Sequence, residues 1–331
     1  MKILAPPAAE LTRGRAATPI AFIRAIVLGY RRRGMDPASA LAQAQIPPTL
    51  LDDAGARVTA AQMEVMSGTA MQELDDEALG WFSRRLPWGS YGMLCRASLT
   101  SPTLEVALKR WCRHHRLLTE DLVLELIPPR SGQRGSATIR IAENTALGEL
   151  REFCLVSTLR YLLGYACWLV DSRIALTEAA FPFPAPSHAE AYAYLFAGPA
   201  HFSADAASIS FDARYLELPV RRDEHALQTM LQRALPLTVL QYRRVRLLVH
   251  SVGQILNADP GGVAGFSTAP ADRLYAPVIA SGPFAYEQVN LAAQLADPAS
   301  LWHRLRRLVA IRKAHRAFGW GDYAFLDQAP P

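Results

Sequence analysis

The adjacent histidines His114 and His115 are the first candidates for catalysis or metal binding in this sequence of 331 residues. An imidazole can transfer protons near neutral pH and is a common metal ligand. The pair lies in a segment with helical spacing, and neighbouring residues of a helix point in different directions, so the two rings cannot hold one ion. His115 shares the apolar face of the segment with Trp111, whereas His114 faces away. We therefore expect His115 to line a core or a pocket.

The four cysteines, Cys95, Cys112, Cys154 and Cys167, carry no metal or disulfide signature. No two of them form a C-x-x-C pair, and none lies at metal-ligand spacing from a histidine. Each stands in an apolar stretch, which favours buried free thiols and a reducing compartment. No Ser-His-Asp set, phosphate-binding loop or zinc motif rises above chance. The sequence therefore predicts no cofactor and no metal site.

A small group of aromatic and polar residues could instead line a binding pocket, since such pockets are usually apolar with a few placed polar groups. Trp88 and Tyr91 lie in the stretch Trp88-Gly89-Ser90-Tyr91-Gly92, which is aromatic and typical of turns. Arg96 follows this stretch, and His115 lies on the next helix. We expect Trp88, Tyr91, Arg96 and His115 to contact a small ligand, with ordinary core packing as the alternative for each.

The overall composition is that of a globular protein, with half of the residues apolar and a fifth charged. A chain of this length forms one large domain or two ordinary ones and can bury a sizeable core. The formal net charge of +5 permits contact with nucleic acid without indicating it, because such contact needs basic residues clustered on one face. The short clusters Arg31-Arg32-Arg33 and Arg243-Arg244-Val245-Arg246 are typical of solvated helix ends.

No segment of the sequence indicates export or membrane insertion. The apolar run at residues 20–28 ends in Gly-Tyr-Arg-Arg-Arg and has no small-residue cleavage site. The longer apolar stretch at residues 147–170 contains Glu149, Glu152 and Arg160, which a membrane span would not tolerate. The sequence therefore predicts a soluble, cytoplasmic protein without a membrane partner.

Three helices are predicted before the candidate pocket residues. Thr18-Pro19 predicts the start of the first helix, because a hydroxyl cap is followed by proline at the first helical position. Asp36-Pro37 begins the second helix. Thr59 and Gln62 form a capping box for the third, which runs to about Asp75.

The middle of the chain alternates helices and strands. Ser101-Pro102 predicts a helix start, and two period-two runs at residues 122–127 and 137–141 flank a loop rich in proline and glycine, which predicts a β-hairpin. The helix after Ser101-Pro102 has one apolar face, formed by Leu104, Leu108, Trp111, Cys112 and His115. The later elements are a buried helix at 147–170, a strand at 173–177, a helix at 188–196, a strand at 208–211 and a helix at 224–256 that Pro236 could break.

The order of these elements indicates an α+β fold: a helix-rich domain with a small antiparallel sheet, followed by a short, mainly helical extension. The segment Asp259-Pro260-Gly261-Gly262 ends the last long helix, and the character of the sequence changes near Asn257. We therefore predict a flexible N-terminus at residues 1–17, a domain at 18–257 and a separate segment at 258–331.

Residues 18–245 resemble the N-terminal, arabinose-binding-like effector domain of AraC-family transcription regulators. The clearest stretch runs from Phe183-Pro184 through Ile209-Ser210-Phe211-Asp212 to Leu218-Pro219-Val220, and the order and spacing also hold upstream. The resemblance implies a domain that binds a small effector and helps two subunits pair, without catalysis. A full regulator of this kind continues into two helix-turn-helix motifs, whose pattern we do not recognise after Arg246. We therefore expect a homodimer, or a heterodimer with an intact regulator, and no specific DNA binding by this chain alone.

Residues 262–328 resemble a late segment of trehalose synthase and its α-amylase-superfamily relatives. The stretches Gly282-Pro283-Phe284-Ala285-Tyr286-Glu287 and Phe318-Gly319-Trp320-Gly321 carry this resemblance, which implies the last turn and helix of a (β/α)₈ barrel. Such enzymes cleave glycosidic bonds with two carboxylates, and in the family these come from earlier barrel strands. Glu287, Asp297 and Asp322 have no partner carboxylate at a recognisable spacing, so we do not expect an enzyme.

Three functional hypotheses remain open at this stage. The leading one is a small-molecule-sensing domain of an AraC-type regulator, with a truncated enzyme-like segment in place of its DNA-binding half. The second is an amylase-superfamily enzyme or fragment acting on maltose or trehalose, which the missing carboxylates disfavour. The third is a fusion product without a selected function. In the enzyme-like segment, an apolar stripe could dock on the sensing domain, pair with a second copy or stay loose: Leu301, Leu305, Leu308 and Ile311.

Overall fold

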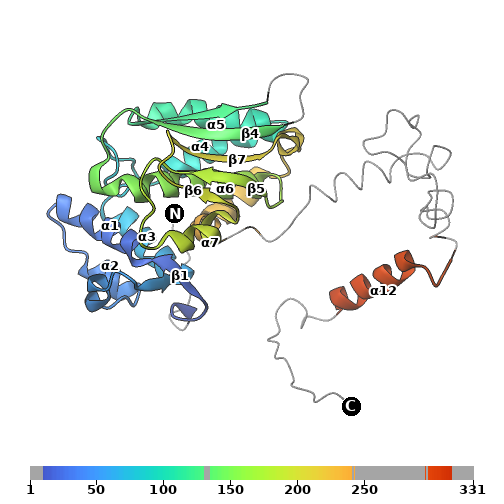
Figure 1. The fold of residues 1–331 in the computed structure, drawn as a ribbon, viewed down its shortest axis with the longest axis horizontal. Helices are drawn as coiled ribbons and strands as arrows, with labels where there is room; N and C mark the ends of the chain where they lie inside the picture. The colour runs from blue at the N-terminus through green and yellow to red at the C-terminus, as the bar shows by residue number, and fades with distance from the viewer. Residues whose placement is uncertain (1–9, 130–134, 241, 243–294, 296, 315–331) are drawn as a thin grey trace, which may run out of the picture. The chain divides into compact units, whose positions relative to one another are not determined.

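The computed structural model describes residues 10–129, 135–240, 242, 295 and 297–314 (Figure 1). The chain separates into two compact units, Met1–Leu247 and Leu248–Pro331. The domain boundary expected near Asn257 lies outside the described residues. The α+β class is confirmed, since the first unit combines helices with one small sheet of mainly antiparallel strands and a second pair of strands.

A pair of short strands opens the first unit. Strand β1 (Ala16–Pro19) pairs antiparallel with β2 (Arg57–Thr59), and helix α1 (Ile20–Arg32) follows β1 directly. The expected helix cap at Thr18 is wrong, because Thr18 is buried within β1 and no side chain caps α1. Because the backbone of Thr18 pairs with β2, Thr18 belongs to a strand and does not cap the helix.

The next two helices begin where the sequence predicts. Helix α2 (Ala38–Gln43) follows Asp36, whose carboxylate accepts a hydrogen bond from the backbone N–H of Ala38. Helix α3 (Ala60–Glu73) has both bonds of the capping box between Thr59 and Gln62. These starts depend only on residues close in sequence, which explains why they could be predicted.

The stretch predicted as a turn at residues 88–92 forms a turn at Trp88-Gly89, but its remainder begins helix α4 (Ser90–Leu99). Gly89 has φ +105°, which favours glycine, and the Glu77 carboxylate accepts hydrogen bonds from the backbone N–H groups of Gly89 and Tyr91. A carboxylate at a helix N-terminus satisfies N–H groups that have no partner within the helix. Helix α4 is therefore capped from a loop twelve residues earlier in the sequence.

Helix α5 (Leu104–Leu118) begins later than Ser101-Pro102 predicts. Thr103 caps it through its side chain and also forms an isolated antiparallel bridge with Pro219, so Thr103 itself is extended. The predicted apolar face is confirmed, because Leu104, Leu108, Trp111, Cys112 and His115 are all buried.

Five strands form the main sheet, in the order β3-β4-β7-β5-β6. Their bounds are β3 (Leu122–Ile127), β4 (Ser136–Glu143), β7 (Ala207–Asp212), β5 (Leu176–Ala180) and β6 (Ala200–His201). Neighbours are antiparallel except β5 and β6, which are parallel. The predicted hairpin is β3 and β4, and their register places Leu124 opposite Ile141, both buried.

The strand expected at residues 173–177 is found three residues later, as β5. The backbone N–H of Ile174 donates to the Cys167 thiol, and that of Ala175 donates to the Tyr215 hydroxyl. These two residues are therefore bonded to side chains, and the sheet ladder starts at Leu176.

Helix α6 (Arg151–Leu169) is the long buried helix that the sequence predicts. It contacts α5, β7 and α9 (Pro236–Val239). The helix expected at 188–196 is shorter, consisting of a 3₁₀ turn followed by α7 (Tyr192–Phe196). After β7, Asp212 caps a 3₁₀ turn by accepting a hydrogen bond from the backbone N–H of Arg214.

The helix expected over residues 224–256 is divided. Helix α8 (Glu224–Leu231) ends before the short helix α9, which starts at Pro236, and the remainder from residue 243 lies outside the described part of the chain. Proline has no N–H to continue a helix, but it is well suited to the first helical position. A Cβ atom at Gly164 of α6 would lie 2.3 Å from the backbone oxygen of Leu237, so α9 packs directly on the glycine.

In the second unit, the described residues include helix α12 (Leu301–Ala314). The predicted apolar stripe is exposed in that unit, with between 48% and 64% of each residue accessible: Leu301, Leu305, Leu308 and Ile311. The Arg306 guanidinium lies 5.2 Å from the centre of the Trp302 ring. Across all the described residues, no helix has the length and apolar character needed to cross a membrane.

Candidate ligand-binding site

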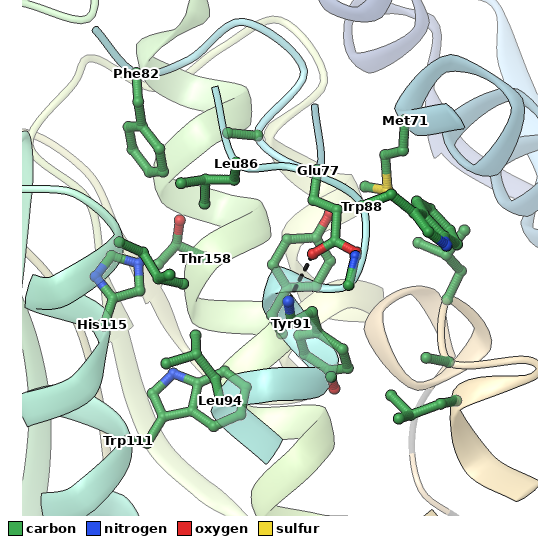
Figure 2. Close-up of a pocket in the computed structure, with 18 of the residues that line it drawn as sticks. Met71, Glu77, Phe82, Leu86, Trp88, Tyr91, Leu94, Trp111, His115 and Thr158 are labelled. Atoms are coloured by element: carbon green, nitrogen blue, oxygen red, sulfur yellow. Dashed lines mark hydrogen bonds between the residues drawn. The ribbon is translucent and has the colours of Figure 1, made fainter. Parts of the chain in front are cut away.

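A cavity of about 410 Å³ lies within the first unit (Figure 2). Its walls come from the end of α3, the loop before α4, helices α4, α5 and α6, and the segment that leads from α8 into α9. A volume of this size lies in the range of pockets for small organic molecules. Trp88, Tyr91, Arg96 and His115 all line the cavity, so the structure brings the four predicted residues together. Their contact with a ligand remains a prediction.

One buried carboxylate, that of Asp76, holds the loop that forms one wall. Asp76 is 1% exposed, and its Oδ1 accepts hydrogen bonds from the backbone N–H groups of Ala78 at 3.1 Å and Leu86 at 2.9 Å. Its Oδ2 accepts from the N–H of Gly80 at 2.9 Å and from the Arg33 guanidinium at 2.5 Å. The closed loop supplies several lining residues: Glu77, Ala78, Trp81, Phe82, Leu86 and Trp88.

Aromatic rings make up much of the cavity wall, and they pack against one another. Tyr91 meets Trp111 edge to face, with ring centres 5.5 Å apart, and lies 5.9 Å from the ring of Tyr161. Tyr161 is in turn stacked on Trp81 at 6.1 Å. Such pairs fix ring orientation beyond what burial alone does, so this wall is formed before any ligand enters. The aromatic lining residues are Trp81, Phe82, Trp88, Tyr91, Trp111 and Tyr161.

Glu77 places a carboxylate in this apolar wall. Its Oε1 accepts a hydrogen bond from the N–H of Gly89 at 2.7 Å, and its Oε2 accepts from the N–H of Tyr91 at 2.6 Å. Burial raises the pKa of Glu77, and the nearby charges of Asp76 and Asp75 add to that effect, while the two backbone hydrogen bonds oppose it. Among the described residues, no arginine, lysine or histidine forms an ion pair with this carboxylate.

His115 lines the cavity as a neutral side chain. It is 6% exposed, and burial lowers its pKa to about 4. Its Nδ1 atom has no hydrogen-bond partner in the described part of the chain, and neither has Trp81 Nε1. No group of three or more His, Cys, Asp or Glu side chains that could hold a metal ion occurs among the described residues.

The cysteines are free and buried, as the sequence predicts. Burial raises the pKa of Cys112 to about 12 and that of Cys167 to about 11. Both thiols therefore stay protonated near neutral pH, which makes them poor nucleophiles.

Arg96 reaches the cavity from α4 with a half-exposed side chain. Its Nε donates to the Glu224 carboxylate at 2.9 Å, which links α4 to α8. An exposed ion pair of this kind contributes little to stability. The positive charge of Arg96 is thus already matched by a carboxylate from another helix.

Sequence reasoning missed Glu77 and the residues that α6 and the α8–α9 segment contribute to the cavity. Thr158 and Tyr161 lie one helical turn apart in α6, but that helix is apolar on all sides, so no face could be selected. Among the lining residues, Leu231 ends α8 and Ala234 and Leu235 follow it, and all three approach the cavity only in three dimensions. The spacing of Trp111 and His115, four residues apart on one face, was the available signal for α5.

Comparison with known proteins links residues of the first unit to a regulator family, and a shorter stretch of the chain resembles an enzyme. The chain is 25% identical over 244 residues to the ornithine utilization regulator of Pseudomonas aeruginosa, which covers 73% of this chain and 71% of that protein. It is also 39% identical over 76 residues to the trehalose synthase of Pimelobacter sp., which covers 23% of this chain and only 13% of that enzyme. The crystal structure of the transcriptional regulator CdpR from Pseudomonas aeruginosa aligns over 89% of this chain and 84% of that one, with 13% identity and a TM-score of 0.34.

The family model described as the arabinose-binding domain of AraC transcription regulators, N-terminal, matches residues 34–220. This range is more than half of the chain and contains the loop, α4, α5 and α6 walls of the cavity. The chain therefore belongs to the family of AraC transcription regulators with an N-terminal arabinose-binding domain.

Proposed function

We propose that this chain is a small-molecule-sensing domain and that its effector binds in the cavity of the first unit. The observation that carries the proposal is the cavity itself, which has about 410 Å³ of space, walls of packed aromatic rings and most of its lining residues within the matched range 34–220. The regulator of Pseudomonas aeruginosa is named for the utilization of ornithine, a small metabolite, and this supports a small-molecule effector here. In the sequence of the enzyme-like segment, Glu287, Asp297 and Asp322 have no partner carboxylate at a recognisable spacing, which disfavours activity on a sugar.

Blocking the cavity is expected to weaken ligand binding at least about tenfold. Ala234 is half-buried and lines the cavity, so the larger side chain of Ala234→Phe would occupy ligand space without replacing a core residue. Ala226→Phe is the matched control, because Ala226 is also half-buried and lies on α8 outside the cavity wall.

Phenylbutanol, a neutral compound with an apolar body, serves as the probe for this test. Titration is followed by tryptophan fluorescence, since Trp81, Trp88 and Trp111 line the cavity. We expect saturable binding by the wild-type chain and by Ala226→Phe, accompanied by a rise in Tm. Equal affinity of Ala234→Phe and the wild type would contradict the proposal, and so would the absence of saturable binding of both this alcohol and its amine analogue, phenylbutylamine, by the wild type.

We further propose that the domain pairs with a second copy or with an intact regulator, and that this chain alone does not bind DNA sequence-specifically. Pairing is implied by the family resemblance, and the sequence after Arg246 carries no recognisable helix-turn-helix pattern. Light scattering should give the mass of a dimer, or that of a complex after co-expression with an AraC-type regulator. Nanomolar, sequence-selective binding in a fluorescence anisotropy assay would refute the DNA part of the proposal.

A further inference from the structure

The charge of Glu77 is the most informative chemical feature of the cavity. In Figure 2 its carboxylate lies beside Tyr91 and Trp88, and Phe82, His115 and Trp111 stand on the other side of the view. Its two oxygens accept one backbone hydrogen bond each, which leaves further lone pairs on both. The two backbone hydrogen bonds at the N-terminus of α4 partly offset the cost of burying this charge, and a bound cation would offset it further.

Other charged groups near the cavity do not supply that neutralisation. The Arg33 guanidinium is paired with Asp76, and Arg96 is paired with Glu224. His115 lines the cavity but is neutral near pH 7. Within the described part of the chain, the charge that faces the cavity without an ionic partner is therefore negative.

We propose that the cavity binds an organic cation, whose ammonium or guanidinium group contacts Glu77 and the ring faces of Trp88 and Tyr91. Aromatic faces attract cations through their ring quadrupole, and a charge-assisted hydrogen bond to a carboxylate adds to that attraction. The apolar remainder of the ligand would extend between Phe82 and Trp111. The same carboxylate repels a ligand that carries a carboxylate at this end. This inference rests on the proposed function.

Three compounds of matched size distinguish the charge classes: phenylbutylamine, phenylbutanol and phenylpropanoate, which are a cation, a neutral molecule and an anion at neutral pH. Their binding to the full chain is measured by isothermal titration calorimetry. We expect the amine to bind about tenfold more tightly than the alcohol, and the carboxylate to bind most weakly. Since this ranking is measured on the wild type, it does not depend on whether a variant folds.

The variant Glu77→Gln tests whether the preference for the amine comes from the Glu77 carboxylate. We expect this variant to lower the ratio of amine affinity to alcohol affinity about tenfold, and the alcohol is the reference for any general change caused by losing one oxygen that accepts a backbone N–H. Asp75→Asn is the matched control, because Asp75 lies on the same loop, accepts a hydrogen bond from the N–H of Trp88 and does not line the cavity. This control should keep the preference for the amine.

The alternatives give different results. If phenylpropanoate binds most tightly, the ligand contact belongs to Arg96 and the proposal is overturned. Equal affinities for the amine and the alcohol would also overturn it. In both cases the proposed function would still stand. If Glu77→Gln weakened the binding of the amine and of the alcohol equally, Glu77 would act only as a cap of α4 and not as a ligand contact. If Asp75→Asn weakened amine binding as much as Glu77→Gln does, the preference would come from the overall negative potential of the loop and not from a direct contact with Glu77. If none of the three compounds binds, the proposed function itself fails.

Discussion

Asp76→Asn is expected to destabilise the first unit by about 3–5 kcal/mol, because it breaks a buried ion pair and leaves the Arg33 charge without its partner. The substitution keeps the shape of the side chain but places an NH₂ group where backbone donors converge. The N–H groups of Ala78, Gly80 and Leu86 would then compete for one remaining oxygen. Since this loop forms a wall of the cavity, ligand binding should be lost together with stability.

Urea denaturation monitored by circular dichroism and by tryptophan fluorescence measures this effect. Asp75→Asn is a matched control on the neighbouring residue, because Asp75 is exposed and accepts a single backbone hydrogen bond, at 3.2 Å from Trp88. Asp75→Asn should lower the free energy of unfolding by no more than about 1 kcal/mol. If the two variants unfold at the same urea concentration, the ionised Asp76 carboxylate does not hold the loop.

Gly164→Ala is the second substitution with a large expected effect, a loss of about 3 kcal/mol. The added Cβ would meet the backbone oxygen of Leu237 at 2.3 Å, which is far inside van der Waals contact. Helix α6 is buried and cannot retreat, so α9 would have to move away from it. A clash with a backbone atom lowers stability more than most overpacking does, because no side chain can rotate to relieve the clash.

Gly92→Ala provides the contrast for Gly164→Ala. Gly92 also lies within a helix, but its added Cβ would meet the Cδ1 atom of Leu231 at 3.2 Å, and a leucine side chain can shift. Alanine also favours the helix more than glycine does, by about 1 kcal/mol. We therefore expect a change within about 1 kcal/mol for Gly92→Ala. Hydrogen exchange at the N–H of Leu240, which donates to the oxygen of Pro236, should accelerate in Gly164→Ala alone.

The elements that the sequence predicts correctly are those whose determinants lie close together in the chain. The capping box of α3 joins residues three apart, and the hairpin of β3 and β4 is marked by alternation on both sides of one loop. The face of α5 was also found, because a helical repeat places Trp111 and His115 together. Four pocket residues could be named for the same reason, since three of them lie within residues 88–96.

The sequence predicts poorly wherever a distant partner decides the conformation. Thr18 has the chemistry of a helix cap, but pairing with β2 places it in a strand. Helix α4 was missed because its capping carboxylate comes from Glu77, on the preceding loop. The α6 wall of the cavity was missed because a helix buried on every side shows no amphipathic pattern.

Leu231, Ala234 and Leu235 line the cavity, and the same segment leads directly into α9 on Gly164. An occupant of the cavity therefore touches a segment near the end of the described part of the first unit. Coupling between two binding events is reciprocal. If a macromolecule favours one position of this segment, it changes the affinity of the domain for the ligand by some factor. The ligand must then change the affinity of the domain for that macromolecule by the same factor. The affinity measured for a ligand is then a property of the assembled state as much as of the cavity.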